Sequence, residues 1–136
     1  MELRIGIIGF GTVGSGFVEL LHEKGRLLES RYGLEARVVG ITDPVKGSIY
    51  DERGLDLARV LELNAAQGSL LGYPGAMPFD DFGSLDLVRA EGVDVVVEVT
   101  PTNLETGEPG ATHIREALKA GKHVITTNKG PIALYY

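Results

Sequence analysis

The sequence contains no cysteine, which excludes disulfides, thiolate zinc sites and cysteine nucleophiles. It also lacks an apolar run near the roughly 18 residues that a membrane span needs. The N-terminus has no basic segment followed by a long apolar stretch, so it does not resemble a secretory signal. No Asn-x-Ser/Thr glycosylation acceptor occurs. We therefore expect a cytoplasmic protein that is not bound to a membrane.

Basic residues are outnumbered, with 13 Lys and Arg against 19 Asp and Glu, which gives a net charge of −6. A broad surface that neutralises phosphates is not expected at this charge, so no nucleic-acid partner is predicted. The 136 residues correspond to one domain, since domains average roughly 150 residues. A hydrophobic share of 43% and a charged share of 24% are typical of a folded globular domain.

Short apolar runs alternate with helical patterns along the chain. The runs at residues 3–8, 36–42, 94–100 and 122–127 are typical of buried strands of a parallel sheet. Residues 65–82 are rich in glycine and proline, so we predict a loop there, with at most a short edge strand near 76–79. Residues 102–110 form a second predicted loop, and residues 128–131 a predicted turn.

The helical patterns lie between these runs. One helix begins at Thr12 and either frays near Gly25 or ends by residues 30–33, and a second covers residues 55–63. A short helix starts at Ser84 and ends at Gly92. A fourth covers residues 112–120, with Ile114, Ala117 and Leu118 facing inward, and residues 132–136 begin a further element. This alternation predicts an α/β fold with a doubly wound parallel sheet of order 3-2-1-4-5 and helices on both faces.

A glycine-rich loop directly follows the first predicted strand. Gly9, Gly11 and Gly14 form the pattern G-x-G-x-x-G between a strand and a helix. The first glycine allows a tight turn, the second lets a pyrophosphate approach the backbone, and the third lets the helix lie close to the strand. Phe10, Thr12 and Val13 would contribute backbone groups at the helix N-terminus. We therefore predict a Rossmann-like dinucleotide site, although a purely structural glycine turn gives the same pattern.

The ribose of a dinucleotide is commonly bound by an acidic residue after the second strand. Glu35 has the usual spacing from the glycines but precedes that strand, whereas Asp43 ends it. We expect Asp43 near the adenosine ribose, with a simple Asp-Pro turn as the alternative. Lys46 or Arg53 could instead meet a 2′-phosphate, so the choice between NAD and NADP stays open.

Ligands in such sheets bind outside the carboxyl ends of the strands. Thr100 and Thr127 lie there and could contact a nicotinamide ribose. Lys129 is a cation at the same edge, suited to polarise a carbonyl oxygen or to move a proton. We predict no metal site, because no ligand cluster has suitable spacing: His22 is interpreted as a solvated helix residue, and His113 and His123 are isolated in the sequence. Glu105 and Glu108 are interpreted as solvated loop carboxylates.

Two segments carry a resemblance to a known family. They are IGIIGFGTVGSGFVELL near the N-terminus and VVVEVTPTNLETGEPGATHIREALKAGKHVITTNKGPIAL near the C-terminus. In this order they closely resemble the N-terminal cofactor domain of homoserine dehydrogenase. The resemblance covers nearly the whole chain, and the TTNKGP ending is more specific than the glycine loop.

The resemblance implies an oxidoreductase that interconverts L-homoserine and L-aspartate 4-semialdehyde with NAD or NADP. That reaction serves threonine, methionine and isoleucine synthesis. It implies that Phe10, Gly11, Thr12 and Val13 hold the pyrophosphate. Thr100, Thr127 and Asn128 would then border the nicotinamide, and Lys129 would face cofactor and substrate.

Members of the family also continue into a substrate and dimerisation domain. We therefore expect residues 1–136 to be a cofactor domain that is inactive alone and whose parent is a homodimer. The alternatives are a non-catalytic nucleotide-binding or sensor module, or a related NAD(P)-dependent reductase.

Overall fold

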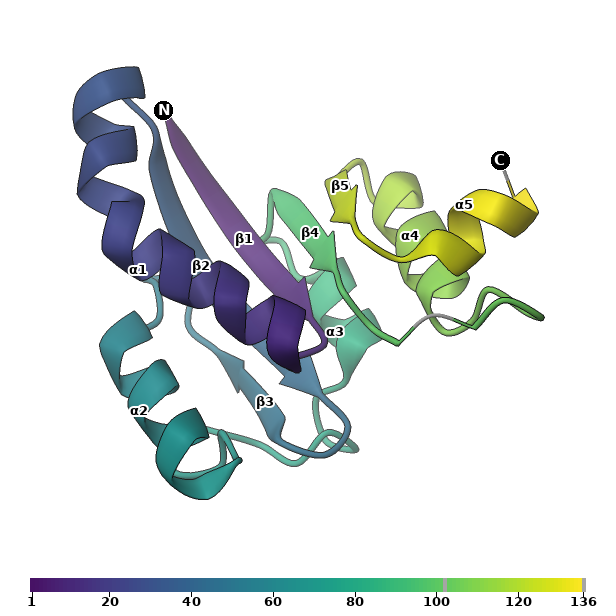
Figure 1. The fold of residues 1–136 in the computed structure, drawn as a ribbon, viewed down its shortest axis with the longest axis horizontal. Helices are drawn as coiled ribbons and strands as arrows, with labels where there is room; N and C mark the ends of the chain where they lie inside the picture. The colour runs from purple at the N-terminus through teal and green to yellow at the C-terminus, as the bar shows by residue number, and fades with distance from the viewer. Residues whose placement is uncertain (102, 136) are drawn as a thin grey trace.

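The computed structural model describes residues 1–101 and 103–135. Its strands are Glu2–Ile8 (β1), Glu35–Asp43 (β2), Gly47–Tyr50 (β3), Val95–Glu98 (β4) and His123–Thr126 (β5). They form one sheet of order β3-β2-β1-β4-β5 (Figure 1). The predicted order 3-2-1-4-5 is confirmed, and β1, β2, β4 and β5 are parallel as expected. Thr102 of the predicted polar loop and Tyr136 of the predicted last element lie outside the described residues.

The outer strand β3 differs from the prediction in place and direction. It follows β2 directly and pairs with it antiparallel, so that Thr42 lies opposite Ser48. The expected edge strand near residues 76–79 contributes only an isolated bridge between Met77 and Ser48. A turn produces this hairpin: the Asp43 carboxylate accepts hydrogen bonds from the amides of Val45 and Lys46. The Asp-Pro pair ends β2, as predicted, but it also returns the chain along the same strand.

The helices follow the predicted alternation, with shifted ends. They span Thr12–Tyr32 (α1), Leu57–Gln67 (α2), Ser84–Arg89 (α3), Gly110–Lys119 (α4) and Lys129–Tyr135 (α5). The helix α2 begins later than predicted because the side chain of Asp56 caps it by accepting from the Arg59 amide at 3.2 Å. It continues to Gly68, whose left-handed backbone (φ 59°) ends it.

The last helix begins inside the segment predicted as a turn. Asn128 caps α5, because its side-chain oxygen accepts from the Gly130 amide at 3.2 Å. Pro131 fits the first turn, where a helix needs no amide donor. Within residues 1–101 and 103–135, none of the helices combines the length and the apolar character that crossing a membrane requires.

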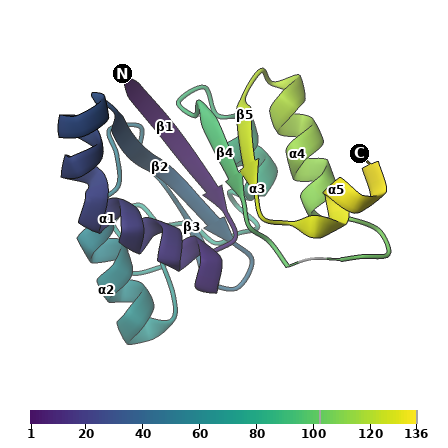
Figure 2. The same ribbon diagram turned by 45° about the horizontal axis from the view of Figure 1, so that its top comes forward.

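Two hydrophobic clusters hold the helices on opposite faces of the sheet (Figures 1 and 2). One cluster joins α1 and α2 to the side chains Ile5, Ile7, Val38, Ile41, Val95 and Val97. The other joins α3 and α4 to Ile8, Val39 and Val96. The inward side of α4 was predicted only in part: Ala117 is buried, but Leu118 is 60% exposed and His113 is buried instead. The alternation along β4 places Glu98 on the same face as Val96, toward α4.

The contact between α1 and the end of β1 is the tightest that the glycine loop imposes. A Cβ atom on Gly14 would stand 2.3 Å from the carbonyl oxygen of Gly9, and backbone cannot yield as a side chain can. We expect Gly14→Ala to lower the free energy of unfolding by about 1–3 kcal/mol, measured by urea denaturation.

Gly25→Ala is the matched control, because this position lies in the same helix and has nothing within 4 Å of an added Cβ. It should raise the free energy of unfolding by about 0.5–1 kcal/mol. Equal effects of the two substitutions would contradict the close contact.

Candidate functional site

The parallel strands end at the edge of the sheet where α1 begins (Figure 2), and a cleft lies at this edge. Its volume is about 500 Å³. It is lined by the glycine loop, the end of β2 and the segments that follow β4 and β5, through Gly9, Phe10, Gly11, Thr12, Val13, Asp43, Val99, Thr100, Pro101 and Thr127. The fold thus brings most of the predicted site residues to one hollow.

The three glycines of the loop have different roles. Gly9 has a positive φ of 96°, and an added Cβ would lie 2.9 Å from the Val99 carbonyl oxygen. Gly9 and Gly14 are therefore required by the fold itself. Gly11 is different, because an added Cβ would meet nothing within 4 Å. Its open side faces the cleft, which leaves room for a ligand against the backbone.

The N-terminus of α1 adds an electrostatic preference for anions. The residue before the helix is Gly11, so no side chain caps the first turn, and no acidic residue occupies that turn. The amide groups of a helix N-terminus carry a partial positive charge and bind phosphate well. The open backbone and this helix end together fit the diphosphate of a dinucleotide.

Asp43 both forms the turn and lines the cleft. Its Oδ1 accepts from the amides of Val45 and Lys46, and its Oδ2 accepts from the amide of Phe10 at 2.9 Å. The alternative interpretation of Asp43 as a turn-forming residue is therefore confirmed. Asp43 also lines the cleft, so the expected contact with an adenosine ribose stays a prediction.

Lys46 stabilises the glycine loop through a hydrogen bond. Its Nζ donates to the Phe10 carbonyl oxygen at 2.6 Å and to Asn64 Oδ1 at 2.8 Å, and it lies 5.4 Å from the centre of the Phe10 ring. The Lys46 ammonium thus has its hydrogen-bond partners within the protein and does not need a ligand to satisfy it. Arg53 lies at the other edge of the sheet, where it pairs with Asp51 at 3.1 Å. Arg53 therefore does not approach the loop.

A buried polar cluster lies beneath the nicotinamide side of the predicted site; we call Glu98, Thr100, His113 and Asn128 the Glu98 cluster. Glu98 is fully buried, and its Oε2 lies 2.6 Å from His113 Nδ1. Its Oε1 accepts from the Thr100 amide at 3.0 Å, from the Thr100 hydroxyl and from Asn128 Nδ2. His113 is isolated in the sequence, but the fold pairs it with Glu98. The one sequence signal was the lone acid in the apolar run VVVEV.

Asn128 and Lys129 lie differently from each other. Asn128 is 3% exposed and turned inward, so it supports the walls of the cleft rather than lining it. Lys129 is exposed at the start of α5 and lines a neighbouring shallow hollow together with Thr127. Its predicted role toward cofactor and substrate stays a prediction.

The Glu98 carboxyl stays ionised in this environment. Burial alone would raise its pKa, since a charged carboxylate loses its hydration. The hydrogen bonds from His113 and Thr100 outweigh that cost and hold the pKa below its ordinary value of 4.5. An ionised carboxylate only accepts hydrogen bonds, so the bonded ring nitrogen of His113 carries a proton.

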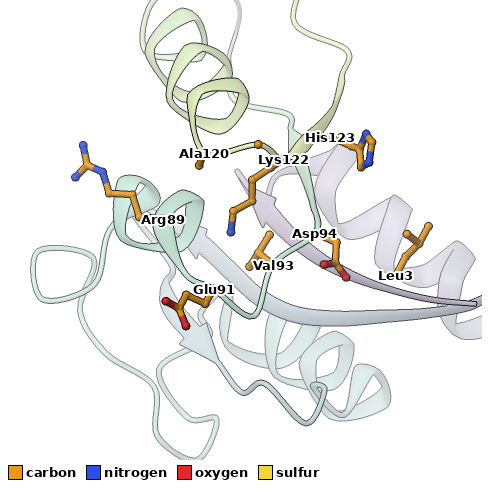
Figure 3. A pocket seen from close by; sticks show the side chains of 9 residues that line it. Leu3, Arg89, Glu91, Val93, Asp94, Ala120, Lys122 and His123 are labelled. Atoms are coloured by element: carbon orange, nitrogen blue, oxygen red, sulfur yellow. The ribbon is translucent and has the colours of Figure 1, made fainter.

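A second hollow of about 490 Å³ opens at the opposite edge, where the parallel strands begin (Figure 3). Its charged groups serve the fold. Asp94 accepts from the amide and the guanidinium of Arg4 at 2.9–3.1 Å. Lys122 reaches across the hollow and donates to the Ala90 carbonyl oxygen at the end of α3, and burial lowers the pKa of this lysine. The edge with the glycine loop is therefore the stronger candidate site.

Comparison with known protein families gives a match over nearly the whole chain. A family model described as homoserine dehydrogenase, NAD binding domain, matches residues 9–136. The homoserine dehydrogenase of Methanocaldococcus jannaschii is 45% identical over 130 residues, covering 96% of this chain and 38% of that protein. The NAD(+)-dependent homoserine dehydrogenase of Pseudomonas canavaninivorans is 36% identical, covering 98% of this chain and 38% of that protein. The chain therefore spans about two fifths of the length of these relatives.

Solved structures agree with this match. A hyperthermophilic archaeal homoserine dehydrogenase mutant in complex with NADPH aligns with a TM-score of 0.81 and 32% identity. The alignment covers 100% of this chain and 39% of that one. A second structure of a hyperthermophilic archaeal homoserine dehydrogenase with NADPH gives a TM-score of 0.79.

The low pKa of Glu98 predicts an acid-sensitive stability. A carboxyl whose pKa is lowered by folding stabilises the native state above its unfolded value, and this contribution is lost as the pH falls below it. The free energy of unfolding should therefore decline below pH 4.5. Glu98→Gln should be less stable at pH 7 and should show a shallower decline, measured by denaturation between pH 7 and 3. Parallel curves for the two proteins would show that Glu98 does not contribute.

Proposed function

The chain belongs to the NAD-binding domain family of homoserine dehydrogenase, and we propose that it is the cofactor-binding part of an enzyme that interconverts L-homoserine and L-aspartate 4-semialdehyde. The single observation that carries the proposal is the open backbone at Gly11 in front of the uncapped N-terminus of α1. Family membership supports the nicotinamide dinucleotide as the ligand, and the similar structures with NADPH support NADP as well as NAD.

Within the proposal, the adenosine end of the dinucleotide binds beside Asp43 and the diphosphate binds at the backbone of Gly11, Thr12 and Val13. The Phe10 amide, also expected there, already donates to Asp43. Lys46 holds the Phe10 carbonyl oxygen and thereby keeps the loop in shape. The negative Asp43 carboxylate faces the cleft but is already bonded to three amides, which tempers its repulsion of a 2′-phosphate. Both NAD and NADP are therefore compatible with this end of the cleft.

The nicotinamide end of the dinucleotide binds between Thr100 and Thr127, which line the cleft. Bound there, the cofactor supplies or accepts the hydride of the reaction. Asn128 supports this end from beneath, and Lys129 stands beside it, exposed at the start of α5. We assign to Lys129 the polarisation of the substrate carbonyl oxygen or the transfer of its proton. The cytoplasmic location and the homodimeric parent expected from the sequence stay predictions.

Cofactor binding is tested first on the chain itself. Gly11→Val should weaken the binding of NADPH and NADH at least tenfold, because the added side chain fills the space that the diphosphate needs. Gly16→Val is the matched control, since Gly16 lies in the first turns of α1 and, like Gly11, has nothing within 4 Å of an added Cβ, but does not line the cleft. Calorimetric titration measures both. Unchanged affinity in folded Gly11→Val would contradict the proposed site, and the ratio of the two affinities gives the cofactor preference.

The role of Lys129 separates an enzyme from a non-catalytic binding module. In a polypeptide that joins these residues to a substrate-binding domain, Lys129→Ala should reduce the rate of homoserine oxidation about a hundredfold, the range of general acid–base catalysis. The affinity for NADPH should change far less, because the lysine lies outside the residues that line the cleft. A non-catalytic module would bind the cofactor equally well and oxidise no homoserine in either form.

A further inference from the structure

The burial of the charged Glu98 side chain costs folding free energy. Glu98 ends a strand of valines, faces the cluster that joins the sheet to α3 and α4, and is fully buried. Burying a charge costs free energy even when the charge is paired, and an apolar side chain of similar volume is often no less stable there. Stability alone therefore does not account for a carboxylate at this point, and its hydrogen bonds give a second reason for it.

The donors around Glu98 come from three separate elements. His113 belongs to α4, Thr100 follows β4, and Asn128 follows β5. The carboxylate accepts from all three, at 2.6 Å from His113 and at 3.4 Å from Asn128, and from both the amide and the hydroxyl of Thr100. One buried group thus joins the ends of two neighbouring strands to the helix that covers them.

The single proton of the Thr100 hydroxyl determines whether this group can donate or accept a further hydrogen bond. A hydroxyl has one proton, and an ionised carboxylate accepts but cannot donate. The Thr100 proton is therefore committed to Glu98, and its oxygen is left as an acceptor. Asn128 Nδ2 lies 3.3 Å from that oxygen, which leaves one lone pair for a ligand. An acceptor at this point suits an N–H donor, such as the primary amide of a nicotinamide.

The same bonds also set the shape of the cleft. The Thr100 amide bonded to Glu98 lies 3.1 Å from the Cβ position of Gly9, so the segment after β4 packs directly on the glycine loop. On the other side, the Thr126 hydroxyl donates to the Glu98 carbonyl oxygen at 3.0 Å and accepts from the Asn128 amide. Residue 127, between these two, lines the cleft. The Thr126 bond uses the main chain of Glu98, so the carboxylate itself reaches this wall through Asn128 Nδ2 and the other wall through Thr100.

We propose that Glu98 is a positioning residue for the nicotinamide end of the cofactor: with its second oxygen held by His113, it fixes Thr100 as a hydrogen-bond acceptor and holds the two strand ends that border the ring. This inference rests on the proposed function, because it assigns the cleft to a nicotinamide dinucleotide. It adds two residues, Glu98 and His113, that touch no ligand and act through Thr100 and Asn128.

The test compares NAD⁺ with ADP-ribose, which carries the same adenosine and diphosphate but no nicotinamide. Calorimetry on the chain measures both dissociation constants for the wild type and for Glu98→Gln, which can donate to Thr100 where the carboxylate accepts. We expect the constant for NAD⁺ to rise about tenfold, because the hydrogen bond between Thr100 and the nicotinamide is lost. The constant for ADP-ribose should change by less than about twofold. A purely structural role would not separate the two ligands.

Asp94→Asn is the matched control, since it makes the same acid-to-amide change beside the same strand but at the opposite edge of the sheet. It should leave both constants unchanged. If Glu98→Gln does not fold, the double variant Glu98→Met, His113→Leu decides, because replacing both partners by apolar groups is the change that burial tolerates best. It should show the same selective loss of NAD⁺ binding.

The outcomes separate two failures. If the wild type binds both ligands and the variants lose both equally, or lose neither, the positioning role is wrong and the cofactor site stands. If the wild type binds neither ligand, the proposed function is wrong and this inference falls with it.

Discussion

The close approach of α1 to the end of β1 is the constraint on which the rest of the structure depends. Gly14 can lie against the Gly9 carbonyl oxygen only because it has no side chain. That contact directs the start of the helix to the edge where the parallel strands end, and it leaves the backbone at Gly11 facing open space. A larger residue at Gly9 or Gly14 would move the N-terminus of α1 away from the cleft. The partial positive charge that favours a phosphate would move with it.

The charged groups at one edge of the sheet stabilise the fold, whereas the opposite edge carries the candidate binding site. At the edge where the strands begin, Asp94 is bonded to Arg4, and Lys122 satisfies the end of α3. These groups have their partners within the protein and hold the chain together. At the edge where the strands end, the backbone at Gly11 is open, and Thr100 lines the cleft. Such a division is general for open α/β sheets, whose ligands bind outside the carboxyl ends of the strands.

Two charged side chains, the half-buried Lys46 and the buried Glu98, lie close behind the surfaces that would meet a ligand. Lys46 holds the glycine loop through a carbonyl oxygen, and Glu98 holds the segments that follow β4 and β5 through amides and a hydroxyl. Each is a charged side chain that fixes backbone rather than presenting its charge to the cleft. A site built in this way keeps its shape before a ligand arrives, which lowers the entropy that binding must supply.

The sequence by itself determined the alternation of strands and helices, the order of the sheet and the position of the glycine loop, because these follow from local periodicity and from short glycine spacings. It also placed Asp43, Thr100 and Thr127 at one edge, since the ends of parallel strands meet there. The tertiary structure alone decided that β3 returns as a hairpin and that Glu98 meets His113, 15 residues away. Those outcomes depend on which distant groups share a buried space, and no local pattern records the partner of a buried charge.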